Sequence, residues 1–103
     1  MSAAPLNLVL HAPDADSLQR ARNNAVNALR AAPACQVRII ANAAGVAAAL
    51  DVPHEATDGL LWLSPNTLNN LDRPARAPLQ VLDGPAVLEL ARLQGAGWAY
   101  IRA

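Results

Sequence analysis

Residues 59–71, GLLWLSPNTLNNL, join a short apolar run to a helical pattern through one well-specified junction. Residues 59–63 have the uninterrupted apolar character of a strand that is buried on both faces of a parallel sheet. Ser64 is a preferred N-cap residue and Pro65 suits the first helical position, so a helix is predicted from this point to about Leu71. A buried strand that leads directly into a helix is typical of α/β folds.

The same alternation of strand and helix extends in both directions from this junction. Strands are predicted at residues 6–11, 36–41, 59–63, 79–82 and 98–102. Helices are predicted at about 14–32, 43–50 and 64–71, and from residue 84 to Gly95 or Gly97. Residues 51–58 and 72–78 contain prolines and polar residues and are predicted to be loops. The chain of 103 residues is therefore expected to form one α/β domain, residues 1–103.

The composition argues against several classes of function. The formal net charge is zero and no block of like charge occurs, so neither nucleic acid nor a membrane surface is an expected partner. The apolar run near the amino end is shorter than a signal sequence or a membrane span, which favours a cytoplasmic location. A lone cysteine, Cys35, gives neither an internal disulfide nor a metal-binding cluster. With no glycine-rich phosphate loop and no paired carboxylates, neither a cofactor nor a metal is expected.

The last predicted helix has more apolar surface than packing on one sheet requires. Its apolar residues, among them Leu88 and Leu93, cover more than half of a helical wheel. Combined with 53% hydrophobic residues and no net charge, this favours a homo-oligomer held together by that helix. The alternative is a monomer that exposes a leucine to solvent.

Polar side chains are predicted to gather at the carboxyl ends of the strands, where parallel sheets form ligand sites. The candidate pocket residues are His11, Asn42, Ser64, Asn66 and Thr67. No catalytic residue is assigned, because a serine nucleophile needs an adjacent base and the second strand is expected to separate Ser64 from His11. A purely structural role remains the simpler interpretation: Ser64 as an N-cap, and His11 as a hydrogen-bonded histidine at a strand end.

Two further side chains that could carry chemistry are predicted to lie elsewhere. Cys35 enters the second strand at its amino end, which is the wrong edge for the pocket, and is interpreted as a small semi-buried residue. His54 follows Pro53 in a polar loop and is predicted to be solvated.

Five segments together carry a resemblance to a known family. They are a strand ending in His (LNLVLHAP), an Asn-rich helix (ARNNAVNAL), a strand leading to an Asn and a Gly-containing turn (VRIIANAAGV), LWLSPNTLNNL, and the ending VLELARLQGAGWAYIRA. Over nearly its whole length the chain thus resembles the DsrE/DsrF-like family. The resemblance implies a three-layer α/β/α fold around a five-stranded parallel sheet, and trimers or hexamers. It also implies a role in sulfur metabolism in which a cysteine carries a persulfide and passes it to a relay partner.

Ser64 stands where that family places its cysteine. A hydroxyl cannot hold sulfane sulfur, because the carrier chemistry needs a thiolate that attacks and leaves through sulfur. The chain is therefore expected to be a non-enzymatic, non-carrier subunit that binds a small ligand or a partner. Two alternatives stay open: sulfur transfer through Cys35 or a partner's cysteine, and a hydrolase or anion site at Ser64.

Overall fold

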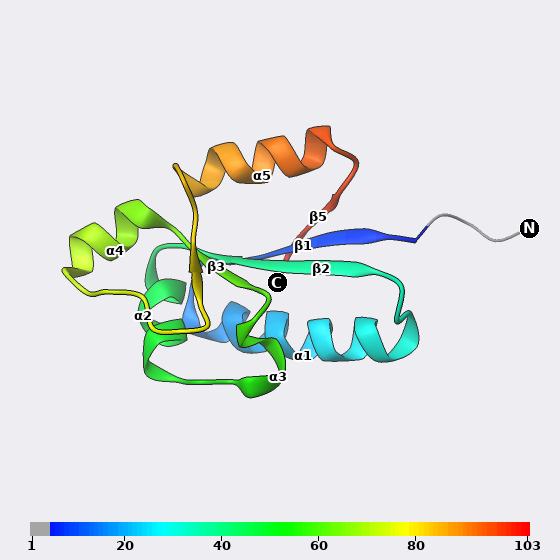
Figure 1. Ribbon diagram of the computed structural model, residues 1–103, viewed down its shortest axis with the longest axis horizontal. Helices are drawn as coiled ribbons and strands as arrows, with labels where there is room; N and C mark the ends of the chain where they lie inside the picture. The colour runs from blue at the N-terminus through cyan, green and yellow to red at the C-terminus, as the bar shows by residue number, and fades with distance from the viewer. Residues whose placement is uncertain (1–4) are drawn as a thin grey trace, which may run out of the picture.

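A computed structural model describes residues 5–103 and shows a five-stranded, all-parallel sheet with helices on both faces (Figure 1). The spatial strand order is β4-β3-β2-β1-β5. The strands are β1 (Asn7–Ala12), β2 (Gln36–Ala41), β3 (Leu61–Leu63), β4 (Gln80–Val81) and β5 (Ala99–Arg102). The helices are α1 (Ala15–Ala31), α2 (Ala44–Asp51), α3 (Glu55–Asp58), α4 (Pro65–Leu71) and α5 (Ala86–Gly95). The prediction of a three-layer α/β/α fold is confirmed.

The two faces of the sheet are covered unequally. Helices α1, α2 and α3 lie on one face, α5 alone lies on the other, and α4 lies beyond the carboxyl ends of the strands (Figure 1). Successive strand residues alternate between the faces, so Leu10 and Ile39 join the cluster beneath α1 while Val9 and Ile40 join the cluster beneath α5.

Helix α1 begins at a complete capping box. The Asp14 side chain accepts a hydrogen bond from the backbone N–H of Ser17 at 2.8 Å, and the Ser17 hydroxyl accepts one from the backbone N–H of Asp14 at 3.1 Å. The bond from the Ser17 N–H is the main reason why the pKa of Asp14 is lowered. Because the cap fixes where α1 begins, it also fixes which side chains face the sheet, namely Leu18, Ala21 and Ala25.

The structure corrects three details of the predicted elements. Residues 51–58 were predicted to be a loop, but they include the end of α2 and the one-turn helix α3. His54 is not a freely solvated side chain, because its Nδ1 lies 2.7 Å from the Thr57 hydroxyl and the residue is half-buried. Leu93 is buried in the cluster beneath α5 and is not free for a subunit contact.

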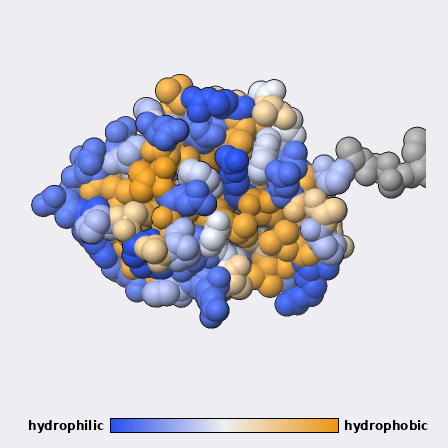
Figure 2. Space-filling view, in the orientation of Figure 1, coloured by the Kyte–Doolittle hydropathy of each residue, from blue (hydrophilic) through white to orange (hydrophobic). Residues whose placement is uncertain are grey.

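Apolar side chains nevertheless remain at the surface of α5. Val87 is 70% exposed and Leu88 is 55% exposed, so one stripe of this helix has no partner within residues 5–103. On the face drawn in Figure 2, hydrophobic surface occurs in separate areas between polar side chains. No helix of the described residues is both long enough and apolar enough to cross a membrane.

Candidate ligand-binding site

The carboxyl ends of the three central strands deliver the predicted polar residues to one edge of the sheet. His11 lies near the end of β1, Asn42 directly follows β2, and Ser64 directly follows β3. Strand β2 lies between β1 and β3, as the sequence analysis expected, and it separates His11 from Ser64. The edge therefore divides into a part around His11 and a part around Ser64.

His11 is held between two polar side chains. Its Nδ1 lies 2.7 Å from the Tyr100 hydroxyl oxygen, and its Nε2 lies 2.9 Å from Oδ1 of Asn42. Because Oδ1 of Asn42 can only accept, it favours the imidazole tautomer that carries hydrogen on Nε2. Nδ1 is then an acceptor for the Tyr100 hydroxyl, so these three side chains form one continuous hydrogen-bonded chain.

The three hydrogen-bonded side chains, of Asn42, His11 and Tyr100, line a cavity of about 370 Å³, here called the His11 cavity. Its other walls come from one side of α5, which contributes Val87, Leu90, Ala91 and Gln94. The volume lies within the range of small-molecule sites, and a few convergent polar groups facing an apolar wall are typical of such sites. The cavity can thus hold a small molecule with one polar end, or a side chain from another protein.

The other three predicted pocket residues do not line the His11 cavity. Ser64 is buried and caps α4 by accepting a hydrogen bond from the backbone N–H of Thr67 at 3.4 Å. The Thr67 hydroxyl in turn accepts one from the backbone N–H of Ala43 at 3.2 Å. Asn66 is exposed. The structure thus brings His11 and Asn42 together. Ser64 instead caps α4, and Thr67 links α4 to the turn that follows β2.

Tyr100 is a residue of this site that the sequence analysis did not identify. It lies on β5, paired in register with Val9 of β1, and therefore points to the same face of the sheet as Val9 and His11. Side chains alternate between the two faces of a strand, so the sequence indicated which residues of the last strand share a face with Tyr100. It did not indicate that this strand lies next to the first, and only that strand order places Tyr100 beside His11.

A second polar cluster lies on the opposite face, and the sequence analysis missed it entirely. Asp58 is 3% exposed and accepts hydrogen bonds from Nη2 of Arg22 at 3.3 Å and from Nη1 of Arg76 at 2.8 Å. The backbone N–H of His54 donates to the same carboxylate at 3.1 Å. Burial alone would raise the pKa of Asp58, but the bond from Arg76, the bond from the His54 N–H and the two positive charges together lower it.

Arg22 is the least usual member of this cluster. It is only 5% exposed, and it lies four residues after Leu18 on the apolar side of α1. Burial lowers the pKa of Arg22, the charge of Arg76 lowers it further, and Asp58 opposes both effects. A basic residue within an apolar stripe was the available signal, because a buried arginine requires an acidic partner from elsewhere in the chain.

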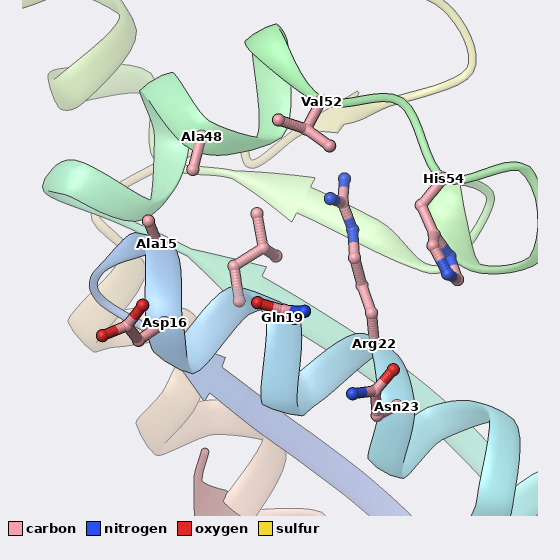
Figure 3. A pocket seen from close by; sticks show the side chains of 9 residues that line it. Ala15, Asp16, Gln19, Arg22, Asn23, Ala48, Val52 and His54 are labelled. Carbon is pink, nitrogen blue, oxygen red and sulfur yellow. The ribbon is translucent and has the colours of Figure 1, made fainter.

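The Arg22 side chain forms part of the wall of a second cavity, of about 420 Å³, here called the Arg22 cavity. Figure 3 shows the guanidinium reaching from α1 toward the α2 side, with Val52 and His54 on either side of it. The lining residues are Ala15, Asp16, Leu18, Gln19, Arg22, Asn23, Ala48, Val52 and His54.

Cys35 lines neither of the two cavities. It immediately precedes β2 at the amino end of the strand, is 8% exposed, and its Sγ lies 3.8 Å from the carbonyl oxygen of Ala28. Within residues 5–103, no group of three or more His, Cys, Asp or Glu side chains is arranged to hold a metal ion.

The sheet topology and the His11 cavity together define a parallel α/β protein with a cavity at the carboxyl ends of its strands. No protein-family model matches the chain, and no curated protein is similar enough to count as a relative. Among solved structures it is similar to a protein of unknown function, MTH1491 from Methanobacterium thermoautotrophicum. The TM-score is 0.79 at 21% sequence identity, over 95% of this chain and 99% of the other. At this identity the similarity establishes the fold.

Proposed function

We propose that this chain is a non-enzymatic, oligomeric subunit of the DsrE-like kind, which binds a small ligand or a partner's side chain in the His11 cavity. The observation that carries the proposal is the chain of hydrogen bonds Asn42–His11–Tyr100, which faces an apolar wall at the carboxyl edge of the sheet. This is the edge at which open parallel sheets bind their ligands.

The residue at position 64 supports a role other than sulfur carrier. The Ser64 hydroxyl is buried and engaged in capping α4, and serine supplies no thiolate. Cys35, the one thiol of the chain, is buried at the opposite end of β2, where neither His11 nor Asn42 is near in the strand register. No observation favours sulfur transfer through Cys35, and it remains an outcome of the first experiment below.

Incubation with a persulfide donor followed by intact-mass measurement tests the non-carrier assignment. The native chain is expected to gain no sulfur. A Ser64→Cys variant places a thiol where the resemblance puts the family cysteine, beside the backbone N–H of Thr67, and is expected to gain one sulfur atom. A gain by the native chain that disappears in Cys35→Ser would contradict the proposal. A Ser64→Cys variant that stays unmodified would contradict the alignment of position 64 with the family cysteine.

The oligomer is proposed to form through the exposed stripe of α5. Light scattering at micromolar concentration is expected to give a trimer or a hexamer, and Leu88→Arg is expected to reduce it to monomers, because a charge on that stripe would be buried without a partner. Leu71→Arg is the matched control, since Leu71 is a similarly exposed leucine, 38%, on α4. A native chain that is monomeric would rule out this part of the proposal.

The ligand role is tested at the ring of His11. Thiosulfate, chosen because the resemblance points to sulfur metabolism, is titrated while the His11 ring resonances are followed by NMR, and the same protein is used as bait for a thiol-bearing partner. Saturable shifts that are lost in Leu90→Trp, which fills the cavity from α5, support a ligand site. If neither thiosulfate nor a partner shifts those resonances, the ligand role is ruled out and His11 has a structural role alone.

A further inference from the structure

The buried cluster around Asp58 contains more positive than negative charge. Two guanidinium groups, of Arg22 and Arg76, share one carboxylate. Arg76 is otherwise well satisfied, because its Nε and Nη2 donate to backbone carbonyl oxygens near the end of α2 at 3.3 and 2.7 Å. Arg22 is therefore the less satisfied of the two guanidinium groups, and it holds Asp58 through the longer of the two contacts, 3.3 Å against 2.8 Å.

Arg22 also has a buried donor without an acceptor. Its Nε is fully buried and makes no hydrogen bond within residues 5–103. Buried donors of this kind are rare in proteins, because a group removed from water needs a replacement partner. The donor belongs to a side chain that is itself 5% exposed and that lines an open cavity, which is the route by which a partner would reach it.

The walls of the Arg22 cavity indicate what that partner is. Ala48 of α2, Val52 directly after α2, and Ala15 and Leu18 of α1 give apolar surface. Gln19 and Asn23 offer neutral hydrogen-bonding groups along α1 (Figure 3). The cluster carries one unit of excess positive charge, and the carboxylate of Asp16 also lines the cavity. The Asp16 carboxylate offsets this charge at the cavity wall, so a singly charged ligand would meet less repulsion from Asp16 than a doubly charged one.

We propose that the Arg22 cavity binds a small monocarboxylate, with its carboxylate on the Arg22 guanidinium and its short apolar chain against Ala48 and Val52. A planar guanidinium matches the geometry of a carboxylate, and binding would supply the missing acceptor. The site lies on the α1–α2 face of the sheet, opposite the His11 cavity, and does not depend on the function proposed for that cavity.

Butyrate is the probe. It is titrated into the full chain while the Arg22 Nε–H resonance is observed by ¹⁵N–¹H NMR, with acetate, inorganic phosphate and N-acetyl-alanyl-alanine as comparison ligands. The expected result is a saturable downfield shift of that resonance, with butyrate binding more tightly than acetate because of the apolar walls. Phosphate binding as tightly as butyrate would overturn the assignment to a carboxylate. Tighter binding of the dipeptide would overturn the assignment to a small molecule in favour of a peptide terminus.

Three variants distinguish a loss of butyrate binding from a loss of folding. Arg22→Lys keeps the charge but removes the Nε donor, and is expected to weaken butyrate binding by at least about tenfold. Ala48→Leu fills the cavity without touching the ion pairs and is expected to abolish binding, which keeps the proposal testable if Arg22→Lys does not fold. Arg20→Gln, an exposed arginine on the same helix, is the control and should bind like the native chain. Unchanged binding in Ala48→Leu, or no saturable shift in the native chain, would overturn the proposal.

Discussion

The Nδ1 atom of His11 lies 2.7 Å from the hydroxyl oxygen of Tyr100, so the first and last strands of the chain meet at the candidate site. The two rings are tilted by 51° with centroids 5.7 Å apart, a geometry that lets the hydroxyl point at the ring nitrogen. Tyr100 is 37% exposed and His11 is half-buried, so the pair is open to a ligand while Asn42 holds the imidazole from its other side.

The tautomer of His11 is the first prediction. In its neutral form, the His11 ring is expected to carry its hydrogen on Nε2, because Oδ1 of Asn42 accepts there. The ¹⁵N shifts of the two ring nitrogens measure this directly. Asn42→Ala should give a mixture of tautomers. Tyr100→Phe should keep the Nε2–H tautomer and lower the free energy of unfolding by about 0.5–1.5 kcal/mol. An Nδ1–H tautomer in the native chain would reverse the assigned direction of both hydrogen bonds.

The second prediction concerns the buried carboxylate of Asp58. Asp58→Asn removes the charge that compensates Arg22 and Arg76, and breaking a buried ion pair in this way costs about 3–5 kcal/mol of unfolding free energy. Urea unfolding at neutral pH measures the loss. Asp51→Asn is the control, because Asp51 pairs with Arg73 on the surface at 2.8 Å, and such a pair contributes about 1 kcal/mol at most. Equal losses in the two variants would contradict the buried network.

The same carboxylate sets a pH dependence. The pKa of Asp58 is lower in the folded chain than in the unfolded chain, where it is about 3.9. Its contribution to stability is therefore fully present above that unfolded value and is lost as the pH falls through the lower, folded one. The native chain should lose stability through this acid range, and Asp58→Asn should lose less, which a series of urea titrations at decreasing pH would show.

Much of this arrangement was accessible from the sequence because local signals agreed with one another. Ser64-Pro65 marked the start of α4 correctly. Pro33 marked the end of the preceding helix and residues 36–41 have a high strand propensity, so β2 was predicted at its observed bounds. The carboxyl ends of adjacent strands meet by geometry, which is why His11 and Asn42 were placed together.

Contacts between residues distant in the chain could not be predicted in this way. Tyr100 reaches His11 only because β5 pairs with β1, and no local pattern states that order. Arg76 lies in a stretch of prolines and arginines that has the composition of a surface loop, yet its guanidinium turns inward to Asp58. Arg22 lies at helical spacing from Leu18 in the sequence, but its acidic partner is 36 residues away, so no local pattern indicated the pair.

The third prediction uses the two tryptophans of the chain. The guanidinium carbon of Arg38 lies 5.4 Å from the ring centroid of Trp62 and 5.1 Å from that of Trp98, so one cation contacts both indoles. Arg38→Gln removes both interactions and should lower the free energy of unfolding by about 1–2 kcal/mol. Tryptophan emission should shift to longer wavelength, because water then reaches the rings. Arg30→Gln, on an exposed position of α1, should change neither quantity.

The fourth prediction concerns the close approach of α2 to the end of β1. A Cβ atom added at Gly45 would lie 2.1 Å from the carbonyl oxygen of Ala12, and the backbone N–H of Gly45 donates to the carbonyl of Pro13 at 3.2 Å. The obstacle is the backbone at the end of β1, so it cannot rotate away as a side chain would. Gly45→Ala should therefore lower the free energy of unfolding by about 2–3 kcal/mol, measured from urea midpoints.

Gly59 is the matched control for that measurement. It has no atom within 4 Å of an added Cβ, and its φ of −68° suits any residue. Gly59→Ala should be neutral or stabilise by up to about 1 kcal/mol, because alanine restricts the unfolded chain without straining the folded one.

The close approach of Gly45 to Ala12 also sets the position of Asn42. Asn42 lies in the turn between β2 and α2 and donates its backbone N–H to the Ala12 carbonyl at 3.3 Å. Gly45→Ala should therefore disturb the ¹⁵N shift of the His11 Nε2 atom as well, whereas Gly59→Ala should leave it unchanged.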